Sequence, residues 1–523
     1  MLSSSDATDG LSANIFKSPD NIQIQAALDI FFMRIYPLPG YAFLHRASLY
    51  DRLHRGQADQ SLLLSIIAIS TCLTETGSSK LRCKMCLGEY SSAFPLVSLL
   101  SRFAFSLKLN YDNQKVCFLA QEARRRLMWA IYMLDQAWAA GLLEFTTCPV
   151  DAIYVSLPCP EEAWELDIGP ETEVQLKSQN RLPGLLAANV CVFYLRDKIL
   201  RHTKRFAAGN YSALDIMYGI RELETELEQF CVRLPPSSAY SKRNLRLRAH
   251  SPWLSRFVLL HVVWHQSHCD LYRCITSGLI ESVPTSILNE FDNAFVTKCR
   301  ERCTDHALQI ADIISSLVDI RPESSVLPMD MAICAYQCIR LLLHGQRAYG
   351  HKLPVPSGRI KKYQQSCLQI IQNIARISPS VHTIECDLKN LIDETQDQNA
   401  HPENCIRHSQ QQTPRQILSI HSLIGRSEFV DDSEELALHD GHASDNSSVH
   451  EKDNDEYNRL LGMSGPLQPL PSFGLTEVMT PGPTMTSQMW LQGSNAFDGA
   501  WDEPGVGFDL IRQMQWDGLG CIG

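Results

Sequence analysis

The sequence predicts an all-α protein: a multi-helix domain with a disordered N-terminus and an acidic, disordered C-terminal tail. Apolar residues recur at steps of three and four along most of the chain, whereas alternating, strand-like runs are rare. With 523 residues, the chain exceeds the roughly 250–300 residues at which one hydrophobic core stops growing, so a large domain plus a further segment is expected. An apolar fraction of 45% and a charged fraction of 20% exclude a fully disordered or fibrous chain.

The first expected helix carries a single apolar stripe and is ended by Pro37. Its stripe comprises Ile24, Ala27, Leu28, Phe31 and Ile35. The same spacing predicts helices over residues 254–272 and 307–318. The best strand-like run, residues 152–157, is bounded by prolines, and we expect it to form an extended connection rather than a strand.

The composition changes after about Glu394, where Gln, Asn and His and then acidic residues replace the apolar stripes. Residues 427–523 contain 17 Asp and Glu against 3 Lys and Arg, so the rest of the chain is almost neutral although the net charge is −11. A tail of this composition buries too little apolar surface to offset its chain entropy. The expected organisation is a disordered segment 1–21, a helical domain 22–394 and a disordered tail 395–523.

The tail is not purely polar, because bulky apolar residues stand among its acids. Phe508, Ile511 and Met514 would share one side of a short helix formed in a partner's groove. The pattern, with Trp501 and Trp516 beside it, is typical of an acidic transcriptional activation segment. The alternatives are an inert acidic extension or a segment that docks Trp516 on its own domain.

Three histidines provide the main candidate for a metal site. His261, His265 and His268 lie on one helical face with Asp270 nearby, and three imidazoles are a ligand set for zinc. They lie on an apolar stripe, however, and no second helix offers a Glu-x-x-His partner, so we favour core histidines. Cys83 and Cys86 form a Cys-x-x-Cys without a second pair at zinc-finger spacing.

The other cysteines are expected to be free. Cys299 and Cys303, like Cys334 and Cys338, are one helical turn apart and are interpreted as thiols that pack between helices. The chain begins without a basic, apolar signal segment, and no stretch approaches the ~18 apolar residues of a membrane span. These features indicate a reducing compartment, cytosol or nucleus, and no membrane partner.

Catalytic signatures are missing from the sequence. It has no Gly-rich phosphate loop, Gly-x-Ser-x-Gly elbow, His-Glu-x-x-His or dinucleotide fingerprint, so we expect no enzyme and no cofactor. A candidate cluster for nuclear import comprises Lys242, Arg243, Arg246 and Arg248; the alternatives are contact with phosphate, a helix start in solvent or pairing with acids. A second basic run, residues 124–126, either contacts phosphate or an import receptor, starts a helix in solvent, or pairs with acids such as Glu122 and Asp135.

The run Glu122–Asp135 resembles the signature of the fungal-specific transcription factor domain, also called the middle homology region. That signature places a Glu, a basic run, an aromatic-bearing apolar segment and an Asp in one helix. The matching residues are Glu122, Arg124, Arg125, Arg126, Trp129 and Asp135. Further stretches resemble the family in the right order over residues 22–345, namely 36–49, 62–73, 155–160 and 259–273.

The resemblance implies an all-helical regulatory domain of a nuclear regulator of RNA polymerase II transcription. In this family an N-terminal zinc–cysteine module usually reads DNA, and the tail activates. The module is not visible here, since the first cysteine is Cys72, and the stretch from Cys72 to Glu122 is short for the family. Zinc is therefore expected only with a separate or missing module, and DNA is reached through it or through a partner.

The expected partners are a coactivator or the transcription machinery, and a second copy or a zinc-cluster factor as a dimer partner. Two rival interpretations stay open. One is a helical metal-dependent enzyme built around His261, His265 and His268, and the other is a corepressor that binds no DNA and partners a complete zinc-cluster factor.

Overall fold

The structure is a computed structural model, and it describes residues 21–71, 90–170, 172–209, 211–279, 281–320, 326–349 and 355–400. All of them belong to one compact unit, Met1–Val430 with Gln513–Gly523; the second unit, Asp431–Arg512, lies outside the described residues. Within these ranges every regular element is a helix, as the sequence predicts. The expected disordered tail beyond Ala400 and nearly all of segment 1–21 lie outside the described residues.

The N-terminal elements are short helices that pack on one another. The expected first helix is confirmed: an α-helical part continues directly into a π-helical turn and ends before Pro37. These elements, in order, are α1 (Asn21–Ile30), η1 (Phe31–Ile35), η2 (Pro39–Tyr41), α2 (Arg46–His54) and α3 (Gln60–Thr71).

The central elements surround the expected signature helix. Residues 153–157 form a connection without helix or strand that follows a short 3-10 turn, so the expected run is a connection and not a strand, although Ala152 belongs to the turn. The elements are α5 (Tyr90–Ser106), α6 (Phe118–Ala139), η3 (Leu143–Phe145), η4 (Val150–Ala152) and α7 (Glu161–Glu165).

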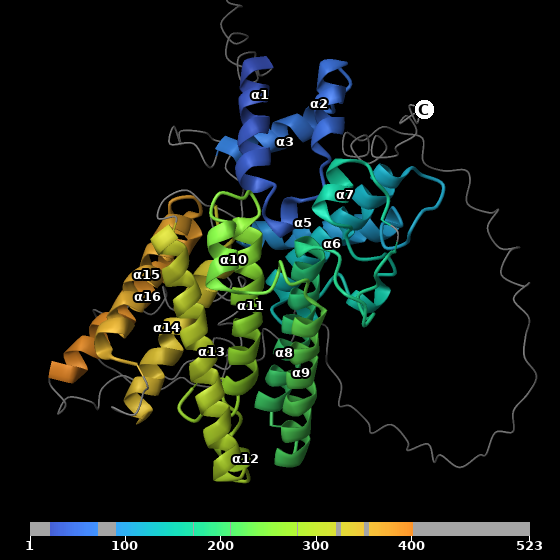
Figure 1. The fold of residues 1–523 in the computed structure, drawn as a ribbon. Helices are drawn as coiled ribbons and strands as arrows, with labels where there is room; N and C mark the ends of the chain where they lie inside the picture. Colours follow the sequence, from blue (N-terminus) through green and yellow to red (C-terminus); the bar gives the residue numbers. More distant parts are fainter. Residues whose placement is uncertain are drawn as a thin grey trace, which may run out of the picture. The chain divides into compact units, whose positions relative to one another are not determined.

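The remaining helices build a bundle in which α11 contacts both α8 and α13 along its length (Figure 1). The helix predicted over 254–272 is α11, and the one predicted over 307–318 is the second half of α13. The final helix extends past the expected domain boundary at residue 394. The bundle comprises α8 (Leu185–Ala207), α9 (Ala213–Arg233), α10 (Lys242–Leu247), α11 (Leu254–Arg273), α12 (Thr285–Leu288), α13 (Asn293–Ile320), α14 (Met329–Tyr349), α15 (Ser357–Ala375), η6 (Pro379–Val381) and α16 (His382–Ala400).

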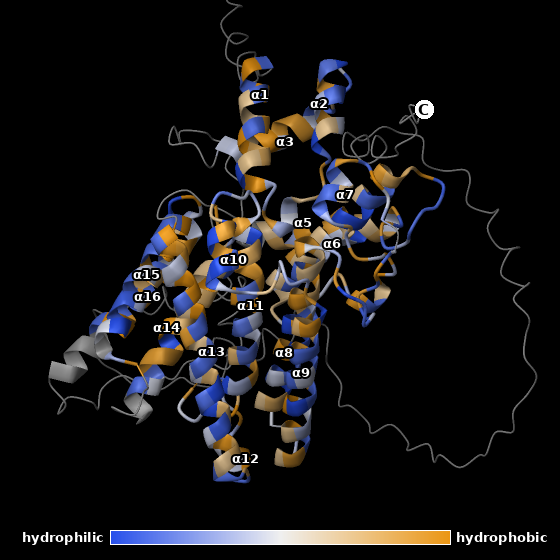
Figure 2. Ribbon diagram, viewed as in Figure 1, coloured by the Kyte–Doolittle hydropathy of each residue, from blue (hydrophilic) through white to orange (hydrophobic). Residues whose placement is uncertain are grey.

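Two apolar clusters supply the main core. The larger cluster joins side chains from α5 to α16, and a smaller one joins α1, η1 and α3 to Leu186 of α8. Along α9 and α13, hydrophilic and hydrophobic residues alternate at helical spacing (Figure 2), so each helix has one face for the core and one for solvent.

The described cysteines are all unbridged, and most are buried. Cys299, Cys303, Cys334 and Cys338 are at most 3% exposed and lie between α11, α13 and α14, which confirms that they pack between helices. Burial raises the pKa of the Cys299 and Cys334 thiols to about 12, so they stay protonated at neutral pH. None of the described helices is long and apolar enough to cross a membrane.

Candidate functional site

The signature helix α6 is buried on nearly every side. It begins after Cys117, whose extended backbone precedes the first turn, and it ends where Ala140 and Gly141 adopt left-handed conformations. Even its charged residues Glu122, Arg126 and Asp135 are at most 2% exposed. Buried charges must be paired or hydrogen-bonded, so their partners show what the signature does.

Glu122 and Arg126 form an ion pair one turn apart on α6. Glu122 Oε1 lies 2.7 Å from Arg126 Nε, and both side chains are fully buried. Glu122 also accepts a hydrogen bond from the backbone N–H of Cys159 at 2.9 Å, and Arg126 donates to the carbonyls of Cys159 at 3.0 Å and Ala42 at 3.3 Å. The pair therefore ties α6 to two distant loops.

Aromatic rings cover this ion pair. The guanidinium of Arg126 lies 4.7 Å from the ring centroid of Trp164 in α7, and Trp164 Nε1 donates to the hydroxyl of Tyr36 at 2.8 Å. Burial is the largest single influence and opposes the charge of Arg126, but Glu122 and the other negative groups around it together outweigh burial and raise the pKa of Arg126. Arg126 therefore stays charged despite its burial.

A second buried arginine completes this junction from α11. Arg256 donates from Nε to the carbonyl of Pro37 at 2.9 Å and from its terminal nitrogen to the carbonyl of Tyr36 at 3.2 Å. It also forms an ion pair with Glu161 and stacks 4.6 Å from the ring centroid of Trp253. We call Tyr36, Glu122, Arg126, Glu161, Trp164 and Arg256 the signature junction.

The junction joins the stretches in which the sequence resembles the family. Residues 36–49, the signature, residues 155–160 and the helix containing 259–273 all contribute to it or adjoin it. No motif in the sequence marks Arg256, Glu161 or Trp164 as functional residues. A signal for Arg256 exists: it is a charged residue one position before Phe257, within an apolar stripe.

The other two arginines of the basic run also have internal partners. Arg125 lies 2.7 Å from Asp112 and 2.6 Å from Glu173, and Arg124 donates to the carbonyls of Leu107 and Lys108 after α5 at 3.1 and 2.9 Å. Pairing with acids is thus what the structure shows for two of the three arginines. A solvated helix start was the wrong expectation for Arg125, which is 3% exposed.

Asp135, the last residue of the signature, has no arginine as its partner among the described residues. Its carboxylate accepts hydrogen bonds from the backbone N–H of Thr147 and Cys148, each at 3.0 Å, and from the Thr147 hydroxyl at 2.5 Å. Trp129 Nε1 donates to the carbonyl of Ser156 at 2.9 Å. The expected pairing of Asp135 with the basic run is wrong, because Asp135 holds the loop after α6 instead.

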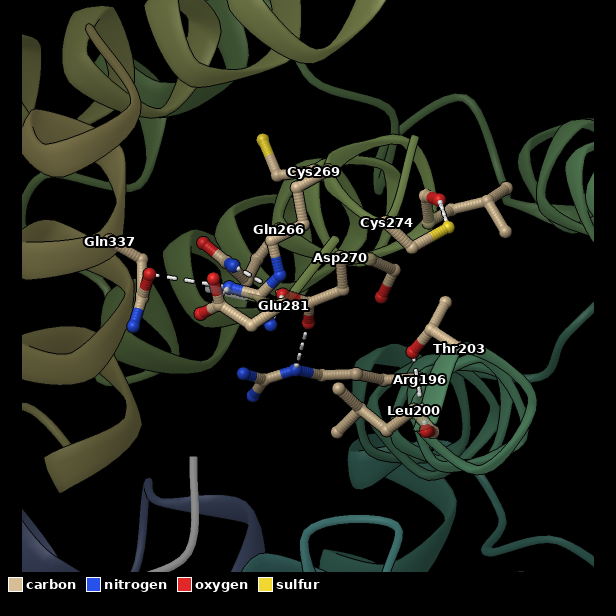
Figure 3. A network of polar contacts seen from close by, with 12 residues as sticks. Arg196, Leu200, Thr203, Gln266, Cys269, Asp270, Cys274, Glu281 and Gln337 are labelled. Atoms are coloured by element: carbon tan, nitrogen blue, oxygen red, sulfur yellow. Dashed lines mark hydrogen bonds and ion pairs between the residues drawn. The ribbon is translucent and has the colours of Figure 1, made fainter. Parts of the chain in front are cut away.

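A second polar network is buried where α8, α11 and α14 meet (Figure 3). Asp270 accepts hydrogen bonds from Arg196 Nε at 3.2 Å, Gln266 Nε2 at 2.7 Å and a terminal nitrogen of Arg273 at 3.0 Å. Arg273 also donates to Gln337 of α14 at 3.2 Å. Asp270, which the sequence places near the three histidines, thus binds two arginines and an amide.

Glu281 is the second carboxylate of this network. Its Oε1 lies 2.5 Å from Arg340 and 3.7 Å from Arg273. Burial raises its pKa, but the two arginines outweigh burial and leave the pKa of Glu281 lowered. The network is therefore an internal set of ion pairs between helices.

A small cavity adjoins the network between α6, α8 and α14. Its volume is about 40 Å³, and its polar lining residues are Gln136, Arg196, Asp197 and Asp330. Burial raises the pKa of Asp197 and of Asp330 despite neighbouring arginines. This volume is far below the ~300 Å³ of the smallest common ligand pockets and fits a few water molecules.

The structure does not bring the three candidate histidines around one point. His261 bonds through Nε2 to the carbonyl of Ser238 at 2.9 Å, whereas His265 Nδ1 lies 2.9 Å from Nδ1 of His306 in α13. His268 stacks on His306, with ring centroids 4.0 Å apart and planes 10° apart. Across the ranges described above, no three His, Cys, Asp or Glu side chains are arranged to hold a metal ion.

Burial keeps these rings neutral. It lowers the pKa of His261 and of His306 to about 4 and that of His268 to about 2, with Arg302 acting in the same direction on His306. His268 is 3% exposed, and neither ring nitrogen has a hydrogen-bond partner. The arrangement is an aromatic contact between α11 and α13.

The candidate import cluster is a short helix, α10, followed by its cap. Lys242 lies 3.1 Å from Asp312, and the guanidinium of Arg248 lies 4.6 Å from the ring centroid of Phe257. Arg243 and Arg246 are exposed. The candidate activation residues, Trp501 to Trp516, and the Cys83–Cys86 pair lie outside the described residues.

Comparison with known proteins identifies the signature region. Residues 81–191 match the family described as "Fungal specific transcription factor domain". This part of the chain is similar to the fungal-specific transcription factor domain. This match includes α6, the loop around Cys159, α7 and the start of α8, which carry most of the signature junction.

A relative over part of this chain is a Zn(2)-C6 fungal-type transcription factor of Fusarium oxysporum f. sp. lycopersici. It is 28% identical over 141 residues, which is 25% of this chain and 13% of the relative's own length. No solved structure matches the chain. The two sequence matches confirm the resemblance and associate the chain with regulation of transcription in general.

Proposed function

We propose that this chain is a nuclear regulator of RNA polymerase II transcription, in which the helical domain is a scaffold and the acidic, aromatic tail recruits a coactivator. The observation that carries the proposal is the signature helix α6, which lies within the family match at residues 81–191. DNA is reached through a partner or through a zinc module outside this sequence. Alone, the chain then gives weak or no sequence-specific DNA binding, and a gel-shift complex that survives raised salt would contradict this.

The contacts of the signature support a scaffold rather than a reaction centre. Glu122 and Arg126 bond to each other and to backbone groups, and Asp135 bonds to the loop at Thr147 and Cys148. A catalytic acid or base needs access to a substrate and a pKa near the working pH. The charges of the signature therefore fix the positions of loops and helices, and we propose that the chain is not an enzyme.

A reporter fusion tests the recruitment step. Residues 427–523, fused to a foreign DNA-binding domain, are expected to activate a reporter, because the acidic segment offers apolar anchors at Trp501, Phe508 and Trp516. Replacing these three anchors by Ala should lower the signal several-fold. The matched control replaces Ser447, Ser448 and Ser464 of the same tail by Ala and should leave the signal unchanged.

The outcomes separate the competing interpretations. A silent fusion removes the activation proposal, and co-purification with a zinc-cluster protein would then support the corepressor. Stoichiometric metal in the purified protein that is lost in His265→Ala would favour the metal-dependent enzyme instead.

A further inference from the structure

Helix α5 exposes four large apolar side chains to solvent, while Phe94, Phe105 and several smaller side chains pack toward the core. Ala93, Val97, Ser101 and Ala104 are at most 6% exposed and face α6 and its surroundings. On the opposite side Leu96, Leu99, Leu100 and Phe103 are 54, 51, 38 and 40% exposed. We call these four residues the α5 stripe.

The stripe has the geometry of one half of a helix–helix interface. Its residues fall at i, i+3, i+4 and i+7, the spacing at which one helix anchors on another. Together they expose on the order of 300 Å² of apolar surface. A contiguous area of this size is typical of an interaction patch, whereas a single exposed leucine needs no explanation. An apolar stripe of this kind is costly in water unless another element covers it.

Charge indicates which element fits. Residues 90–111 contain no Asp or Glu, and their two charged residues are the exposed Arg102 and Lys108. Arg102 lies beside the stripe, between Leu99 and Phe103 in sequence. An occupant with acidic residues along the edge of its apolar face gains ion pairs here, whereas a basic one is repelled.

The same features argue against a second copy of the chain. Two α5 helices paired antiparallel would bring Arg102 residues near each other without a carboxylate on the helix to pair with them. The stripe alone also falls short of the ~800 Å² per partner that a stable dimer interface buries. A single amphipathic helix needs less area than a folded protein.

We propose that the α5 stripe is a docking surface for an amphipathic helix of another protein that has acidic residues beside its apolar face. This goes beyond the recruitment by the tail, because it is a second interaction surface, located on the helical domain itself. If the α5 stripe binds no such helix, the reporter result expected for residues 427–523 does not change.

Two designed peptides test the proposal with the full chain. Each is an 18-residue helix with Leu at i, i+3, i+4 and i+7, flanked by Glu in one peptide and by Lys in the other. In fluorescence anisotropy we expect the Glu peptide to bind at least tenfold more tightly than the Lys peptide, and the difference to shrink at high salt. Equal binding of both peptides, or binding of neither, would overturn the proposal.

Variants locate the binding on α5. The double variant Leu99→Ser/Phe103→Ser should weaken binding of the Glu peptide at least tenfold. Its matched control, Leu214→Ser/Tyr218→Ser, alters residues on α9 that are 62 and 63% exposed and should change binding less than twofold. If the α5 double variant does not fold, Arg102→Glu decides: it should reduce or reverse the preference for the Glu peptide, and an unchanged preference contradicts the proposal.

Sedimentation velocity tests whether the α5 stripe binds a second copy of the chain. We expect the wild-type chain and Leu99→Ser/Phe103→Ser to sediment alike. A wild-type dimer that this variant dissociates would show that α5 pairs with itself, and it would overturn the proposal.

Discussion

At the residue scale, the structure explains why a helix in the core carries so many charges. Glu122 and Arg126 stand one turn apart, neutralise each other and also hydrogen-bond to the backbone around Ala42 and Cys159. Removing one partner of a buried ion pair leaves the other charge without compensation, which is far more costly than losing an exposed pair.

Replacing Arg126 by Met is therefore expected to lower the free energy of unfolding by about 3 to 5 kcal/mol. Urea denaturation followed by circular dichroism measures this. The control is Arg55→Ala, which breaks an exposed pair with Asp51 on α2 and should cost less than about 1 kcal/mol. Equal losses in the two variants would show that the signature pair is not structural.

The double variant Glu122→Gln/Arg126→Met tests the coupling of the two charges. It should be more stable than Arg126→Met alone, because no unpaired carboxylate is left in the core. A double variant that is less stable than the single one would mean that the backbone hydrogen bonds of Glu122 matter more than its charge.

At the scale of elements, close approach of α6 and α8 depends on Gly141. Its φ of +83° is strained for other residues, and an added Cβ would lie 2.6 Å from Cβ of Leu200 and 2.8 Å from its backbone carbon. Real Cβ atoms essentially never come this close, so one of the two helices would have to move. The turn after the signature helix thus sets how α6 meets the bundle.

Gly141→Ala is expected to destabilise the protein by about 3 kcal/mol or more, from backbone strain and from the clash with Leu200. The matched control is Gly56→Ala, which has a φ of +67° but no atom within 4 Å of the added Cβ. The control should cost only about 1 kcal/mol of conformational strain. Thermal unfolding compares the two variants, and losses of equal size would contradict the close approach.

At the scale of the whole molecule, the buried histidines couple stability to pH. In the unfolded chain a histidine gains its proton near pH 6.5, whereas burial lowers the folded-state pKa of His261 and His306 to about 4 and of His268 to about 2. Between these values the unfolded chain binds more protons than the folded protein. The contribution of these neutral histidines to the free energy of unfolding is therefore complete above about pH 6.5, and it is lost as the pH falls toward their folded-state pKa values.

Lowering the pH from 7 to 5 should accordingly reduce the free energy of unfolding, by about 1 to 2 kcal/mol for each buried histidine. In His268→Phe the reduction should be smaller by that amount, because one proton-binding group is gone. Urea midpoints at the two pH values measure it. The exposed His54, changed to Asn, serves as control, and equal reductions in all three proteins would contradict the assignment.

Helix positions were predictable because periodicity is a local property of the chain. The stripe at 24–35, the helices over 254–272 and 307–318 and the connection after Ala152 match the structure, although Ala152 itself ends a 3-10 turn. The pair Glu122–Arg126 was also within reach, since residues four apart on a helix are neighbours. The partners predicted for Asp135 were wrong because its actual partners, Thr147 and Cys148, lie in a loop, and a loop has no hydrophobic periodicity from which its position could be predicted.

Sequence alone determined that the chain is helical, that its last hundred residues are acidic, and that Glu122–Asp135 resembles a fungal transcription factor signature. Only the tertiary structure decided that the signature's charges are buried, that His306 joins His265 and His268, and that four large apolar side chains of α5, from Leu96 to Phe103, face solvent. The physical reason is that spacing along a helix specifies which residues share a face, whereas the element that covers this face comes from elsewhere in the chain.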